Sequence, residues 1–105
     1  MKTSVTKFGD LALITSPQLL FPKQVEPFLR EKGYQPASEE DALRLVNDES
    51  IFFRIATIPA KTACERGKSF HQERYENGQR LVYSEWEWPS AYLPGTCFIA
   101  KKIQS

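Results

Sequence analysis

Branched and aromatic residues recur along residues 81–88, and a more polar segment, residues 68–75, precedes them. The pair Asn77-Gly78 lies between the two segments and is preferred in two-residue type I′ turns, whose central residues need positive φ. Branched and aromatic side chains suit the pleated surface of a strand. The pattern therefore predicts a long β-hairpin over residues 64–89 that closes at Asn77-Gly78.

A two-residue turn also sets which residues of the two strands face each other, beginning with Glu76 opposite Gln79. In this register one face collects most of the large rings, and His71 lies there opposite Ser84. The large residues of that face are Tyr75, Val82, Trp86 and Trp88. We expect this face to join the core, because an aromatic ring buries about 150–250 Å². A change of one residue in the register would exchange the two faces.

The second face of the predicted hairpin mixes apolar with charged residues. Its members are Lys68, Phe70, Arg74, Arg80, Leu81, Tyr83 and Glu85. Such a mixture suits either a face covered by a helix or a contact surface, because aromatic and arginine side chains are enriched at interfaces. The loop 90–95, which contains Tyr92 and Leu93, would extend that surface.

Two helices are predicted before the hairpin. The more regular one follows Ser38, which suits an N-cap, and three acidic residues fill its first turn, where negative charge is favourable. The residues at its core-facing positions are Ala42, Leu45 and Val46. The other helix is predicted over residues 23–32. Pro27 fits poorly inside it, so a start with Pro27 as the first helical residue is the alternative.

Three further apolar segments predict strands, over residues 5–15, 51–58 and 96–103. Gly9-Asp10 marks a bulge or a turn in the first, and the second reads as a central strand covered on both faces. The order is then β-α-α-β-β-β-β, which is typical of an α+β fold. We expect one compact domain over residues 1–105, with a single antiparallel sheet of four to five strands and two short helices packed on one face.

Composition narrows the functional classes. A chain of 105 residues with 41% hydrophobic and 26% charged residues is an ordinary globular domain, and its net charge of +1 argues against a strongly basic nucleic-acid binder. Cys64 and Cys97 make neither a disulfide framework nor a zinc site. The apolar run 11–14 is too short for a signal peptide, and no window is long enough to span a membrane. We expect a cytoplasmic protein with reduced thiols.

No common catalytic or cofactor motif is present. The chain has no glycine-rich phosphate loop, no Gly-x-Ser-x-Gly elbow and no metalloprotease helix. No cofactor or metal is therefore implied. His71 and Glu73 would point the same way on a strand and, with nearby cations, would suit a small metal-independent nuclease. Ordinary solvated positions on an exposed strand explain the same pair more simply.

Nucleic-acid binding is the second functional hypothesis. Cations that track phosphates and rings that stack on bases are interleaved in the hairpin. These residues are Arg66, Lys68, Phe70, Arg74, Tyr75, Arg80 and Tyr83. Against this reading, glutamates of the same hairpin nearly cancel its positive charge.

The leading hypothesis is a small non-enzymatic binding protein of the inhibitor or regulator type. It would contact another protein through the hairpin, residues 66–88. The sequence does not indicate its oligomeric state. The predicted contact residues are Lys68, Phe70, Arg74, Arg80, Leu81, Tyr83 and Tyr92. This hypothesis loses its basis if Phe70, Tyr83 and Tyr92 are all buried inside the monomer.

Overall fold

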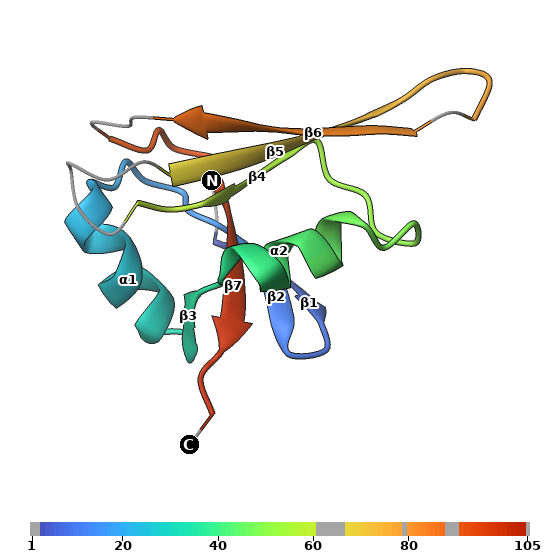
Figure 1. Cartoon of the computed structure of the whole chain (residues 1–105). Coiled ribbons are helices and arrows are strands. Elements are labelled where there is room, and N and C mark those ends of the chain that lie inside the picture. The colour runs from blue at the N-terminus through green and yellow to red at the C-terminus, as the bar shows by residue number, and fades with distance from the viewer. Residues whose placement is uncertain (1–2, 61–66, 79, 88–90, 105) are drawn as a thin grey trace.

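A computed structural model of the chain describes residues 3–60, 67–78, 80–87 and 91–104, without the side chains of residues 74, 80, 86 and 87 (Figure 1). The chain forms an α+β domain with two helices and a mixed sheet. In chain order the elements are β1 (Ser4–Phe8), β2 (Leu11–Thr15), α1 (Pro22–Arg30), β3 (Tyr34–Pro36), α2 (Glu39–Val46), β4 (Ile55–Ile58), β5 (Gly67–Arg74), β6 (Arg80–Glu87) and β7 (Cys97–Lys102).

Within the described residues the sheet has seven strands rather than the expected four to five. Gly9, with φ of 66°, splits the predicted first strand into β1 and β2. Residues 34–36 form β3 beside the end of β7, at a position where proline is tolerated. The element order is therefore longer than the predicted β-α-α-β-β-β-β.

β7 is the strand around which the sheet is organised. It pairs antiparallel with β2 on one side, while on the other side β4 lies beside its start and β3 beside its end. The contact with β4, at Thr57 and Phe98, is parallel, so the expectation of a purely antiparallel sheet is wrong. In Figure 1 β7 runs at a steep angle to β5 and β6. The sheet thus has two parts, β1–β2–β7–β3 and β4–β5–β6.

α2 packs on one face of both parts of the sheet. The Ser38 hydroxyl accepts a hydrogen bond from the Asp41 amide at 3.1 Å, which confirms the predicted N-cap. The helix buries the predicted residues against β2, β5 and β7. The buried residues of this core are Leu11, Leu13, Ala37, Ala42, Leu45, Val46, Ile51, Ala56, Phe70 and Ile99.

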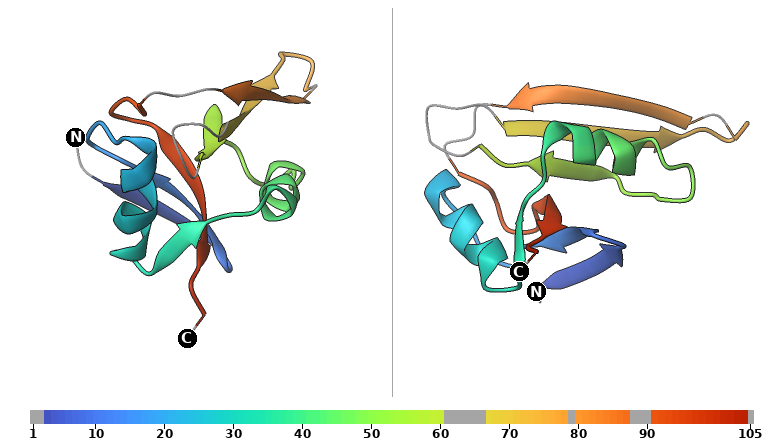
Figure 2. Two further views of the ribbon diagram at one scale, coloured as in Figure 1. Left: turned by 60° about the vertical axis from the view of Figure 1, so that its left-hand side comes forward. Right: turned by 60° about the horizontal axis from the view of Figure 1, so that its bottom comes forward.

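α1 packs on the opposite face of β2 and β7, so the prediction that both helices share one face is wrong. Figure 2 shows the two helices on either side of β7. The reason is that β2 and β7 are apolar at successive positions, and successive side chains point to opposite faces. The second core contains Ala12, Ile14, Leu20, Val25, Phe28, Leu29, Tyr34, Tyr92, Phe98 and Ala100.

α1 begins at Pro22 and continues through Pro27, so the alternative start at Pro27 is wrong. A proline inside a helix costs about 3 kcal/mol. Burying the apolar face that contains Val25, Phe28 and Leu29 contributes about 1.5–3 kcal/mol for each side chain. That gain exceeds the cost, which accounts for a helix that a local reading of the sequence would interrupt.

Candidate functional site

The predicted hairpin is present as β5 and β6, but its turn differs from the expected one. Arg74 pairs with Arg80, and the Gly78 amide donates a hydrogen bond to the Tyr75 carbonyl at 3.0 Å. Gly78 has φ of 84°, whereas Asn77 does not have positive φ. This arrangement matches a type I turn followed by a left-handed glycine, and not the predicted type I′ turn.

The different turn shifts the register by one residue and exchanges the faces of the hairpin. Phe70 and Val82 belong with the core under α2. His71 pairs with Tyr83 instead of the expected Ser84. Trp88 and the side chain of Trp86, which we expected to anchor the core, lie outside the described residues.

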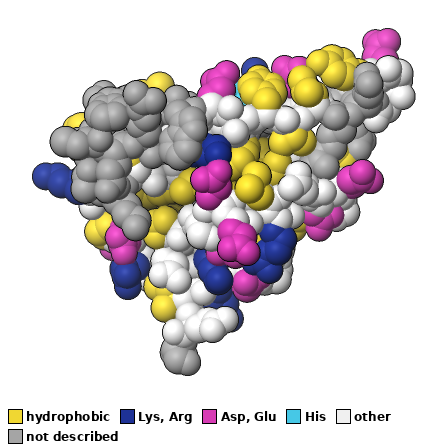
Figure 3. Space-filling view, viewed as in Figure 1, with side chains coloured by type: hydrophobic (Ala, Val, Ile, Leu, Met, Phe, Trp, Pro, Cys, Tyr) yellow, Lys and Arg dark blue, Asp and Glu magenta, His cyan; other side chains and the backbone are white. Residues whose placement is uncertain are grey.

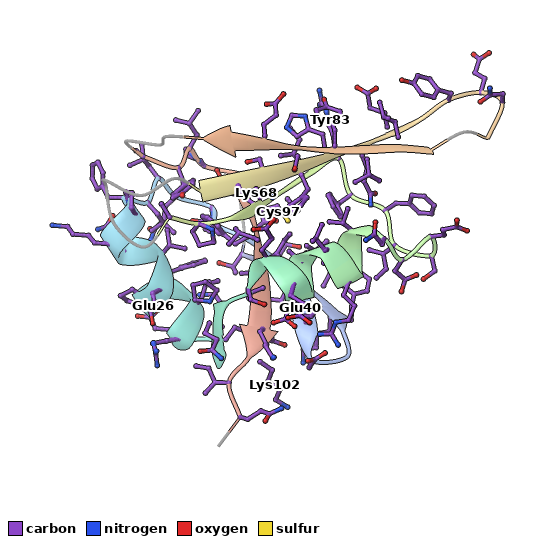
Figure 4. All side chains as sticks on the ribbon, in the orientation of Figure 1. Glu26, Glu40, Lys68, Tyr83, Cys97 and Lys102 are labelled. Atoms are coloured by element: carbon purple, nitrogen blue, oxygen red, sulfur yellow. The ribbon has the colours of Figure 1, made fainter. Side chains whose placement is uncertain are left out.

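The face of β4, β5 and β6 that points away from α2 is called the outer face below. Its described side chains are Ile55, Thr57, Ser69, His71, Glu73, Leu81, Tyr83 and Glu85. In Figure 4 Tyr83 lies on the side of the hairpin away from α2, and Lys68 lies on the side towards it. The pairing of Thr57 with Phe98 continues the outer face into the face of β7 that α1 covers.

The rest of the chain covers only one end of the outer face. Thr57 and Ser69 are only 3% and 1% exposed, whereas Ile55 and Leu81 are 42% and 43% exposed. Ile55 lies beside His71, and His71 lies beside Tyr83, in three neighbouring strands. Figure 3 shows hydrophobic side chains together with acidic and basic ones along the upper edge of the molecule. The outer face therefore presents apolar groups to solvent.

His71 and Tyr83 form a cross-strand pair at the centre of the outer face. The His71 Nδ1 atom and the Tyr83 hydroxyl are 2.8 Å apart, and the ring centroids are 4.8 Å apart. Desolvation, followed by the charges of Glu73 and Glu85, raises the pKa of Tyr83. The two carboxylates therefore lie close enough to Tyr83 to act on it electrostatically.

A groove of about 490 Å³ lies at the covered end of the outer face. Its walls are formed by β4, β5 and the segment that leads into β7. The lining residues are Ile55, Thr57, Ser69, Ala91, Tyr92, Leu93, Pro94, Gly95, Thr96 and Cys97. Burial raises the pKa of the Cys97 thiol, although a hydrogen bond with Thr15 acts in the opposite direction.

The structure separates the predicted contact residues. Phe70 and Tyr92 are core residues with 1% and 3% exposure, so neither side chain lies on the open surface. Lys68 forms an ion pair with Glu39 of α2. Leu81 and Tyr83 do lie together on the outer face. Arg74 and Arg80 pair in the ladder, but their side chains, like all of Arg66, lie outside the described part of the chain.

Sequence reasoning missed Ile55 and the groove as parts of this surface. Ile55 belongs to an apolar segment that we expected to be buried on both faces. The groove is formed by segments far apart in the sequence, namely residues 55–57, 69 and 91–97. The only sequence signal for the surface is the alternation in the hairpin, which identifies a face correctly only when the register is right.

The geometry bears on the two other functional hypotheses. The charged side chains described on the outer face, Glu73 and Glu85, would repel phosphates. Among the described residues, His71 forms its side-chain hydrogen bond with Tyr83 and not with Glu73. Within residues 3–60, 67–78, 80–87 and 91–104, no group of three or more His, Cys, Asp or Glu side chains could hold a metal ion.

Among the described residues, no helix has the length and apolar character needed to cross a membrane. No protein-family model, curated protein or solved structure matches the chain.

Proposed function

We propose that this protein is a non-enzymatic binding module that recognises another protein through the outer face of β4, β5 and β6. The observation that carries the proposal is a sheet face left uncovered beyond Ser69, with Ile55 and Leu81 exposed beside the His71–Tyr83 pair. Antiparallel sheets that face water on one side usually carry polar residues there. Contiguous apolar groups at such positions mark an interaction surface.

The charges of the outer face indicate the chemistry of the partner. Glu73 and Glu85 flank Tyr83 closely enough to raise its pKa. A complementary partner surface would carry arginine or lysine side chains around an apolar centre. Arginine is the better match, because its guanidinium pairs with carboxylates and also stacks on aromatic rings.

Charge reversal at one exposed residue tests the proposal. The purified chain, Leu81→Asp and the control Leu43→Asp are each immobilised and exposed to an extract of the host cell. Leu43 is on α2 and is 41% exposed, close to the 43% of Leu81, so both substitutions should change stability by only about 0.5 kcal/mol. Mass spectrometry then compares the proteins that each variant retains.

The wild-type chain and Leu43→Asp are expected to retain the same discrete protein, and Leu81→Asp is expected to lose it. Retention by Leu81→Asp together with loss by Leu43→Asp would place the contact on α2 and overturn the proposal. Recovery of nuclease-sensitive nucleic acid, with no protein dependent on Leu81, would favour the nucleic-acid hypothesis instead.

A further inference from the structure

The groove at the covered end of the outer face is built by contacts that hold its loop wall in place. The Gly95 amide donates to the Ser16 carbonyl at 2.8 Å, and the Thr96 amide donates to the Leu93 carbonyl at 3.2 Å. Leu20 and Tyr92 exchange two further backbone hydrogen bonds, at 3.0 and 2.7 Å. The loop wall is therefore fixed to the segment between β2 and α1, and the groove exists before any ligand arrives.

Among the described residues, the lining of the groove carries no charge. Its residues are aliphatic, hydroxyl-bearing, glycine or proline, apart from the ring of Tyr92 and the thiol of Cys97. A charged group placed there would lose hydration without gaining an opposite charge. The groove therefore favours a neutral ligand with an apolar body.

Two buried hydroxyls give the groove a hydrogen-bond donor. Thr57 Oγ1 and Ser69 Oγ are 3.0 Å apart, and the two residues are 3% and 1% exposed. Their mutual hydrogen bond uses one hydroxyl proton. Within the described part of the chain, the other proton has no acceptor. Because buried polar groups are nearly always hydrogen-bonded, this spare donor marks a position for an acceptor of the ligand.

We infer that the groove binds an aliphatic side chain of an extended segment of the partner protein, with a backbone carbonyl of that segment accepting the spare hydroxyl proton. The inference rests on the proposed function, because Ile55 belongs both to the groove and to the exposed outer face. Glu85 pairs with Ser69 across the strands. A basic residue close to the aliphatic one in the partner segment would therefore complement the carboxylate beside the groove.

Titration with blocked amino acids tests the groove without the partner. N-acetyl-leucine methylamide supplies the aliphatic side chain and two carbonyls, and N-acetyl-aspartate methylamide is a charged control of similar size. The leucine compound should shift the amide resonances of residues 55–57, 69 and 91–97 in the isotope-labelled chain. Equal shifts with the aspartate compound, shifts confined to other residues, or no shifts would overturn the inference.

Variants separate the hydroxyl contribution from the apolar one. The double variant Thr57→Val, Ser69→Ala removes both hydroxyls. Its affinity for the leucine compound should be roughly fivefold lower, which is the effect of one hydrogen bond. Leu93→Asp, at a groove residue that is 68% exposed, should abolish binding without disturbing the core. Leu43→Ala should leave the affinity unchanged. Undiminished binding by the double variant would overturn the role of the hydroxyls, and undiminished binding by Leu93→Asp would overturn the site.

Failure of the groove can be told apart from failure of the proposed function. The titration uses no partner, and Leu81 does not line the groove. If the leucine compound does not bind while Leu81→Asp still abolishes protein capture, only the groove inference falls. If the compound binds but capture does not depend on Leu81, the groove stands as a site and the outer-face proposal falls.

Discussion

At the scale of single residues, close packing decides which side chain is tolerated at position 67. A Cβ atom at this position would lie 2.9 Å from the Ile58 carbonyl oxygen and 2.9 Å from the Tyr92 hydroxyl. The same hydroxyl accepts a hydrogen bond from the Ala60 amide at 2.8 Å. Gly67 is thus required by a close backbone approach and not by a left-handed conformation.

We therefore predict that Gly67→Ala lowers the free energy of unfolding by about 1–3 kcal/mol, because the added methyl group overpacks this contact. Urea denaturation of the variant measures the change. Ser84→Ala, at an exposed position of β6, is the control and should change stability by less than about 0.5 kcal/mol. A Gly67→Ala chain as stable as the wild type would show that the approach is not close in solution.

A second residue-scale prediction concerns Asp41 and pH. Burial by itself would raise the pKa of Asp41, but the hydrogen bond with Ser38 and the charges of Lys101 and Arg44 outweigh it and lower the pKa. A carboxylate whose pKa is lowered by folding stabilises the fold above its unfolded pKa, and this contribution is lost as pH falls through the folded pKa. Asp41→Asn should therefore lower the free energy of unfolding by an amount on the order of 1 kcal/mol at neutral pH.

The cost of Asp41→Asn should shrink as the pH falls below the ordinary aspartate value of 3.8. Thermal or urea unfolding of both chains across an acidic pH series measures it. Glu40→Gln, at an exposed neighbour in the same helical turn, should show a smaller cost. A cost of Asp41→Asn that does not vary with pH would argue against the ionised contact.

At the scale of elements, the hairpin shows what a local pattern can and cannot predict. Asn77-Gly78 indicated a turn, and the turn is there. Both a type I′ turn and a type I turn with a following left-handed residue place Gly78 at positive φ, so the dipeptide alone does not separate them. The choice depends on burying Phe70 and Val82 under α2, which is a tertiary effect.

Engineered disulfides test this register. In a background with Cys64→Ser and Cys97→Ser, the pair Glu73→Cys and Leu81→Cys should oxidise readily, because the two residues face each other. The pair Glu73→Cys and Val82→Cys, which the two-residue turn would favour, should stay reduced because the side chains point to opposite faces. The mass of the alkylated products distinguishes the outcomes, and the reverse preference would restore the register expected from the sequence.

Helix prediction had a similar limit. The Ser38 cap and the acidic first turn of α2 are local signals, and they identified the helix correctly. Pro27 is also a local signal, but it misled, because α1 continues through it. There the burial of neighbouring apolar residues in the second core outweighs a local preference.

At the scale of the whole molecule, the essential asymmetry is that α2 packs against both parts of the sheet, whereas α1 covers only the part around β2 and β7. Continuous apolar runs in β2 and β7 signal burial on both faces. We had expected such burial for residues 51–58 instead. The outer face beyond Ser69 is what remains uncovered. Its members Leu81 and Tyr83 were predicted, while Ile55 and the groove required the tertiary arrangement.

The central claim is that the outer face of β4, β5 and β6 contacts the partner protein. Backbone amide exchange, followed by mass spectrometry of the free chain and of its complex with the captured partner, tests it most directly. Binding should slow exchange in β4, β6 and residues 91–97 and leave α1 and α2 unchanged. Slower exchange confined to α1 or α2, with the hairpin unaffected, would contradict the account.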